Sequence, residues 1–223
     1  MPADNYQSGL PVGGATRNPF NYSKVEQVSR DNATPWLSLA EITNQLNLFD
    51  DVSQDSYLLG LEVAVRQAIE DYLGMSIFPV SYRVWYGIES LAAAPLSLDV
   101  PEVSQNANAT LAGVTITSLK YSTDEFPPTV VTVSPSIYYF DASGNKLIVQ
   151  SLPTSINSTM TAPIVLDYST VSNPLAAYPV IKQAGLLLLT HLYNNRSDTT
   201  DAKLNNIPFG VATLLRPYKP LVM

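Results

Sequence analysis

The sequence of 223 residues contains no cysteine and only one histidine, His191. The absence of cysteine excludes disulfide bridges, thiolate catalysis, iron–sulfur clusters and cysteine-ligated zinc. A single histidine leaves one candidate base for a Ser/His/Asp triad, and no nucleophile-elbow motif accompanies it. Because His191 lies within an apolar helical pattern, we favour a packed structural histidine over a catalytic base.

Charged residues are also scarce, at 14% of the chain compared with about a quarter in an average soluble domain. The net charge of −7 argues against a protein that grips nucleic acid by counterion release. The charge is unevenly distributed, since residues 36–80 carry −6 whereas residues 173–223 carry +3. An acidic body with a basic C-terminal end favours head-to-tail or docking contacts.

Long hydrophobic runs are absent, because the most apolar stretch is Leu186–Leu189 and a membrane span needs about 20 residues. Asp50, Asp51 and Asp55 admit two interpretations: a metal site or carboxylate pair of a small acid-dependent enzyme, or acids at a helix N-terminus. The glycine and terminal glutamate of a calcium loop are missing, which favours the helix N-terminus. We therefore expect no membrane contact, no metal and no cofactor.

The first part of the chain divides into a predicted arm and a predicted pair of helices. Residues 1–35 contain glycine and proline without a sustained period, which indicates an extended arm. This arm either lacks fixed structure or orders on a partner. Over residues 36–80, a capping box formed by Ser38 and Glu41 predicts a short helix over 39–47. Apolar residues at helical spacing then predict a second helix of roughly 20 residues that ends at Gly74.

The middle of the chain, residues 81–172, changes to a β pattern of alternating and β-branched residues. It predicts an antiparallel β-domain of six or seven strands, with a hairpin loop at 141–145. The expected strands cover residues 82–88, 96–100, 114–121, 129–133, 137–140, 146–150 and 164–168.

A helical pattern returns at Pro179 and defines the segment 173–215, with a long apolar helix to about 195 and a short helix that ends near Leu215. Residues 216–223 form a basic, proline-containing tail. The predicted fold class is therefore α+β. A helical bundle formed by the N- and C-terminal helices carries an inserted antiparallel β-domain.

The two helical ends resemble the head–tail connector (adaptor) family of long-tailed bacteriophages. The first stretch that carries the resemblance comprises Trp36–Ile42, Leu46, the acidic turn Asp50-Asp51, Asp55–Leu59, Ala64, Ala68 and Ile69–Gly74. The second comprises Pro179–Ala184, the leucines that follow, His191–Arg196, Ile207–Val211 and Leu214–Tyr218. The middle is similar to longer members that carry a β insert with an Asp-x-x-Gly hairpin.

This resemblance implies a structural virion protein rather than an enzyme. Members of the family form a homo-oligomeric ring, usually twelve-fold, at the neck of the virion. The ring docks under the portal, continues the channel through which genomic DNA passes without specific binding, and offers a platform to the next neck or tail protein. The resemblance also implies assembly in the host cytoplasm. Another neck or tail-completion ring protein, such as a stopper or tail terminator, stays open as an alternative.

The resemblance also implies roles for particular residues. Family members hook onto the portal through the C-terminal segment, which here corresponds to Arg216, Pro217, Tyr218, Lys219 and Leu221. Acids are expected to line the channel, where negative walls repel DNA phosphates: Asp50, Asp51, Asp55 and Glu62. Contacts between neighbouring subunits are expected at Arg66, Glu70 and Arg196, from their helical placement.

Overall fold

The computed structural model describes residues 21–49, 51–87, 95–103, 113–151, 155–196 and 209–219. The chain divides into two compact units. The β unit takes its described residues from 21–29, 81–103 and 113–169, and the helical unit from 30–80 and 170–219. Helices and two antiparallel sheets make up the predicted α+β class.

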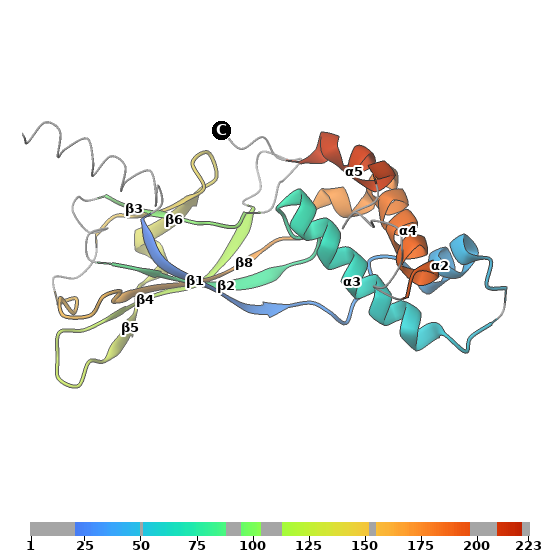
Figure 1. Ribbon diagram of the computed structural model, residues 1–223. Helices are drawn as coiled ribbons and strands as arrows, with labels where there is room; N and C mark the ends of the chain where they lie inside the picture. Colours follow the sequence, from blue (N-terminus) through green and yellow to red (C-terminus); the bar gives the residue numbers. More distant parts are fainter. Residues whose placement is uncertain are drawn as a thin grey trace, which may run out of the picture. The chain divides into compact units, whose positions relative to one another are not determined.

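The helical unit is built around the pair α3 (Asp55–Leu73) and α4 (Pro179–Asn194), which lie side by side (Figure 1). The pair is antiparallel, because Tyr57 in the first turn of α3 packs against Tyr193 in the last turn of α4. Both helices also contact α2 (Leu39–Leu46), and α4 contacts α5 (Phe209–Leu215). Two short 3₁₀ helices, η3 (Pro174–Ala177) and η4 (Arg216–Tyr218), flank α4 and α5.

The predicted helix boundaries follow from local chemistry. The Ser38 hydroxyl accepts from the Glu41 amide, and the Glu41 carboxylate accepts from the Ser38 amide at 2.8 Å, so the capping box is confirmed. Asn47 ends α2 in the left-handed conformation at φ 56°. Gly74 ends α3 at φ 70°, a conformation that favours glycine and confirms the predicted stop.

A single apolar core holds the helical unit together. Trp36 and Leu37 lie in it just before α2, and the indole Nε1 of Trp36 donates to the Ala176 carbonyl at 2.9 Å. The facing stripes of α3 and α4 supply most of the remaining side chains, as expected for helices that cannot bury an apolar face alone. The fully buried members include Ile42, Leu58, Val65, Ile69, Leu73, Ile181, Ala184, Leu188, Leu189, Val211 and Leu215.

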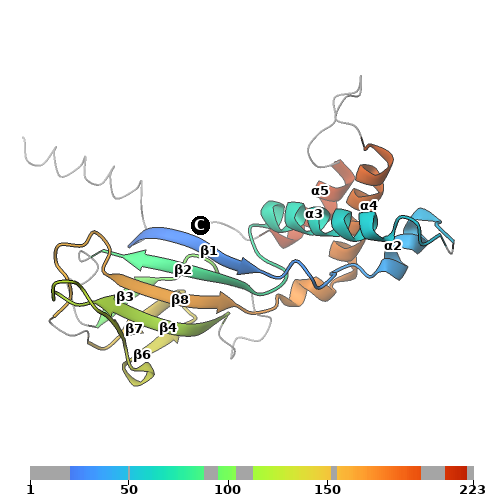
Figure 2. The same cartoon turned by 90° about the horizontal axis from the view of Figure 1, so that it is seen from below.

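The β unit consists of two antiparallel sheets that face each other (Figure 2). The five-stranded sheet has the order β1-β2-β8-β4-β5, and the three-stranded sheet has the order β3-β7-β6. The strands are β1 (Tyr22–Arg30), β2 (Val80–Tyr86), β3 (Leu96–Asp99), β4 (Val114–Ser122), β5 (Val130–Thr132), β6 (Tyr138–Asp141), β7 (Lys146–Val149) and β8 (Ile164–Thr170), with a 3₁₀ turn, η2 (Pro135–Ile137), before β6.

The core of the β unit lies between these sheets. In the register of β2 and β8, Val84 stands opposite Leu166, and both side chains are buried. Leu98 and Leu147 oppose each other in the smaller sheet and face the same core. The alternating burial along these strands matches the alternating sequence pattern from which they were predicted.

The structure corrects one element of the sequence-based description. Residues 22–30, expected in an extended arm, form the edge strand β1 of the five-stranded sheet. The alternation that identifies a strand is missing because most β1 side chains are exposed, and only Tyr22 and Val25 pack against the core. None of the described helices is long and apolar enough to cross a membrane.

Candidate functional site

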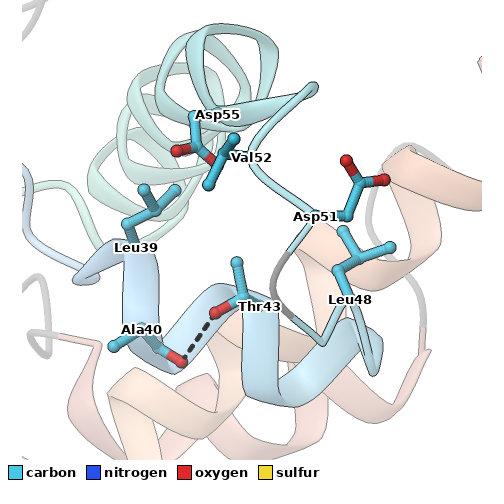
Figure 3. A pocket seen from close by; sticks show the side chains of 7 residues that line it. All are labelled: Leu39, Ala40, Thr43, Leu48, Asp51, Val52 and Asp55. Carbon is cyan, nitrogen blue, oxygen red and sulfur yellow. Dashed lines mark hydrogen bonds between the residues drawn. The ribbon is translucent and has the colours of Figure 1, made fainter.

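A pocket of about 250 Å³ opens on the helical unit where α2 meets the start of α3 (Figure 3). Leu39, Ala40 and Thr43 of α2 form one side, and Leu48 and Val52 of the connecting loop form another. Asp51 and Asp55 complete the lining. The Thr43 hydroxyl donates to the Ala40 carbonyl at 3.2 Å, so the charged groups that line the pocket are the carboxylates of Asp51 and Asp55.

The pocket is acidic as well as apolar, because two of its seven lining residues are aspartates and none is basic. The Asp51 side chain accepts from the Ser53 hydroxyl and amide, which holds the pKa of this carboxyl below its ordinary value. Asp51 is therefore ionised at neutral pH. The volume is smaller than the roughly 300–1,000 Å³ of pockets that enclose small-molecule ligands. It is large enough for one or two anchoring side chains of a protein partner.

Two large apolar side chains of the loop between α2 and α3 are exposed. Phe49 is 80% exposed and Val52 is 75% exposed, although the loop that carries them is anchored by the buried core on both sides. Sequence analysis did not single out either residue. The signal was weak, since an apolar residue between two helices is as easily explained by packing as by exposure. Exposed apolar residues beside a pocket are typical of interaction surfaces.

The predicted channel acids fall in different environments. Asp51 is exposed and Asp55 is half-buried at the pocket, so their channel role stays a prediction, and Asp50 lies outside the described residues. Glu62 does not fit this role because it is 1% exposed within the helical unit. Its carboxylate accepts from the main-chain amides of Trp36 at 2.9 Å and Leu37 at 3.4 Å. Burial raises the pKa of Glu62, and these hydrogen bonds only partly oppose that effect.

The predicted subunit contacts at Arg66 and Glu70 do not fit the structure either, because both side chains are buried in the helical unit. The Arg66 guanidinium donates to the carbonyls of Thr34 and Asp31, each at 2.8 Å, and stacks over Phe78. Glu70 accepts from the Ile77 amide at 2.7 Å and lies 3.4 Å from Nη1 of Arg30. One face of α3 therefore holds residues 30–37 in place. The sequence pattern predicted a contact with a neighbouring subunit at this face, because charged side chains are rarely buried.

Arg196, the third predicted subunit contact, is exposed. Its guanidinium lies 4.6 Å from the ring centres of both Tyr57 and Tyr193 and donates to Gln54 at 2.7 Å. These partners belong to the same unit, at the end where α3 begins and α4 finishes. A contact of Arg196 with a neighbouring subunit stays a prediction.

The predicted portal-docking segment starts as the 3₁₀ helix η4 and is fixed to its own unit up to Lys219. The Tyr218 ring packs edge-on against Tyr178 with centroids 5.8 Å apart, and Nζ of Lys219 lies 5.2 Å from the ring centre of Tyr72. Arg216 and Pro217 are exposed, and Leu221 lies outside the described residues. Portal docking by this segment stays a prediction.

The described residues assemble no group that is recognisable as catalytic. His191 on α4 is half-buried, and the Asn195 side-chain amide lies 3.5 Å from its Nδ1. No group of three or more histidine or acidic residues in the described ranges has the geometry to hold a metal ion. Hydrogen bonds from Ser53 hold the pKa of Asp51 below its ordinary value, whereas a general acid needs a raised one.

Comparison with known proteins identifies relatives by fold alone. No family model matches this chain, and no curated protein matches it. A chain in the neck of an empty gene transfer agent (GTA) particle, with C6 symmetry, matches at a TM-score of 0.59 and 19% identity. A chain of the virion of a native GTA particle matches at 0.60 and 18%, and one from the neck of a native particle, with C12 symmetry, at 0.53 and 17%. Each match covers 90% of this chain and 97% of the other.

Proposed function

We propose that this chain is a structural neck protein of a tailed-phage-like particle. In its finer form, the proposal is a homo-oligomeric ring, twelve-fold, that docks under the portal. The ring continues the DNA channel and presents a platform to the next neck or tail protein. The protein acts by binding its neighbours and carries out no reaction.

The fold match is the observation that carries this proposal. It spans 90% of this chain and 97% of chains from GTA particles, two of them from the neck, so both units of the chain take part. At 17–19% identity this likeness establishes a common fold, and function is an extension of it. The sequence resemblance to connector proteins, which rests on separate motifs at the two helical ends, supports the same extension.

Charge is consistent with a channel through which DNA slides. A net charge of −7 on each subunit multiplies in a ring, and a negative field repels phosphates instead of holding them. The exposed apolar residues Phe49 and Val52 are consistent with a chain that completes its burial in an assembly.

Co-assembly with the portal tests the proposal. Purified chain is mixed with portal rings of the same particle, and the mixture is sedimented and imaged by electron microscopy. We expect co-sedimentation and an added ring at one end of the portal channel. A chain that stays in the supernatant, or that averages to another part of the particle, contradicts the portal-proximal position.

The same experiment separates the alternatives. A stopper ignores bare portal rings and binds only to portal already carrying another neck ring, while a tail terminator binds to the end of the tail tube. An acid-dependent enzyme ignores all of these assemblies and shows turnover that is lost on Asp55→Asn.

A further inference from the structure

We propose that the α2–α3 pocket receives the C-terminal segment of a second copy of this chain, residues 219–223, and that this contact joins neighbouring subunits. The proposal rests on the ring assembly proposed above and supplies a contact for it. It commits the tail to a neighbouring subunit, whereas the family resemblance directs the same tail to the portal.

The pocket offers an apolar floor and negative charge. Leu39, Leu48 and Val52 line it together with Asp51 and Asp55. Phe49, which follows Leu48 in the chain, is exposed. A volume of about 250 Å³ suits side chains of an extended peptide. Surrounding residues 36–80 carry a net charge of −6, so a basic partner is favoured at long range as well as at contact.

The C-terminal segment has the complementary chemistry. Arg216 and Lys219 are cations, and the residues after them are Pro220, Leu221, Val222 and Met223, which are apolar. The prolines at 217 and 220 restrict the backbone, which reduces the entropy lost when the segment binds. A basic residue followed by an apolar run matches an apolar pocket lined by carboxylates.

The occupant has to come from another molecule, because the tail begins at the opposite end of its own helical unit. Lys219 lies over Tyr72, and Tyr218 packs on Tyr178 immediately before α4. Tyr72 follows the pocket residue Asp55 by 17 positions in α3, which is about 26 Å of helix. Residues 220–223 fully extended cover at most about 14 Å and start from the wrong end.

The separation of pocket and tail also permits a head-to-tail contact between subunits. A donor surface at one end and an acceptor at the other make a heterologous, head-to-tail interface, which closes into a ring when the rotation between subunits is a fraction of a turn. Reciprocal exchange of tails in an isologous dimer would use the same two surfaces, and a wild-type assembly larger than a dimer distinguishes the ring from it.

Complementary variants test this contact by sedimentation velocity on the full chain. Val52→Lys places a cation in the acceptor at a position that is already 75% exposed, and deletion of residues 220–223 removes the apolar part of the donor. We expect each variant alone to be monomeric under conditions in which the wild-type chain associates. An equimolar mixture should form a 1:1 dimer and nothing larger, since one intact donor meets one intact acceptor.

Val130→Lys is the matched control, because Val130 is 67% exposed on β5 of the other unit. It should associate as the wild type does. Self-association that survives deletion of residues 220–223, or a mixture that stays monomeric, overturns the proposal.

A peptide assay keeps the proposal testable if the free chain does not associate measurably. A labelled peptide of residues 216–223 is titrated with the full chain and followed by fluorescence anisotropy. We expect saturable binding that weakens about tenfold or more with Val52→Lys and is unchanged with Val130→Lys. No binding, or binding that ignores Val52→Lys, overturns the pocket assignment.

Portal co-sedimentation of the tail-deleted chain distinguishes this inference from the proposed function. If the deletion abolishes portal binding but preserves self-association, the tail is a portal hook, and the inference fails while the neck function stands. If the wild-type chain binds neither portal nor other neck rings, the proposed function itself fails.

Discussion

Gly185 of α4 lies directly against the indole ring of Trp36. A Cβ atom added at Gly185 would lie 2.7 Å from Cζ3 and 2.9 Å from Cη2 of that ring. The ring has little freedom to move away, because its Nε1 donates to the Ala176 carbonyl and the side chain is buried in the helical core. Glycine at this position therefore serves close packing of α4 on the segment before α2.

Gly185→Ala is expected to destabilise the protein even though alanine is the better helix former. The overpacked ring should cost about 1–3 kcal/mol, which exceeds the gain in helix propensity of about 1 kcal/mol. Gly60→Ala is the control, because a Cβ at Gly60 in α3 meets nothing within 4 Å. In urea titrations, the unfolding midpoint of Gly185→Ala should lie below that of the wild type, and the midpoint of Gly60→Ala should lie at or above it. Equal gains for both variants would contradict the close approach of Trp36.

Arg66→Lys is expected to lower the free energy of unfolding by about 1–3 kcal/mol. A lysine ammonium lacks the planar fork that donates to both Thr34 and Asp31, so a buried carbonyl is left unpaired. Arg83→Lys on β2 is the control. The Arg83 side chain, which pairs with Asp167, is 41% exposed. Its replacement should therefore change the free energy of unfolding by less than about 1 kcal/mol. The two variants are compared by chemical denaturation, and similar losses would contradict the anchoring role of Arg66.

Glu41 should make stability depend on pH in the acidic range. The hydrogen bond from Lys182, together with those from Ser38, lowers the pKa of Glu41 from 4.5 to about 2. Because the folded-state pKa is the lower one, the carboxylate stabilises the fold above pH 4.5, and this contribution disappears as the pH falls towards about 2. Thermal unfolding of Glu41→Gln between these pH values should decline less steeply than that of the wild type. Lys182→Met should also weaken the decline in thermal stability over this pH range. A decline as steep as that of the wild type in either variant would exclude the Glu41–Lys182 pair as the cause of the pH dependence.

Tyr86→Phe should destabilise the β unit by about 1 kcal/mol. The buried Tyr86 hydroxyl donates to the Asp99 carbonyl at 2.8 Å, so its removal leaves that acceptor unpaired. Burial also raises the pKa of Tyr86, which keeps the hydroxyl protonated. Tyr139→Phe, at a side chain that is 64% exposed, should leave the midpoint of denaturation unchanged. Equal effects at the two tyrosines would argue against the buried hydrogen bond.

Local features of the fold were predicted well because their causes are local. Ser38 and Glu41 are three residues apart and cap α2 with their own side chains. Gly74 adopts the left-handed backbone conformation that ends α3. The strands around Val84 and Leu166 were recognised because each strand buries alternate side chains against one core. In these cases the chemistry that decides the structure lies within a few residues of sequence.

The residues of the candidate site were harder to predict from the sequence, because the site depends on which segments of the chain pack together. Glu62, Arg66 and Glu70 occur at a four-residue spacing that places them on one helix face, and charge on such a face normally faces solvent or a partner. They are buried because residues 30–37 cross that face. Main-chain groups of this segment pair with Glu62 and Arg66, whereas Glu70 accepts from the Ile77 amide. Phe49 and Val52 show the opposite outcome, since these apolar side chains are left exposed to solvent.

The α+β class, the helix limits and most strands could be predicted from the residues alone, because hydrophobic period, capping and left-handed glycine act over short distances. Long-range packing makes residues 22–30 an edge strand, buries the charges of α3, and leaves an acidic, apolar pocket open between α2 and α3. These outcomes depend on segments far apart in the chain coming together, and burial is a property of the whole arrangement rather than of any one residue.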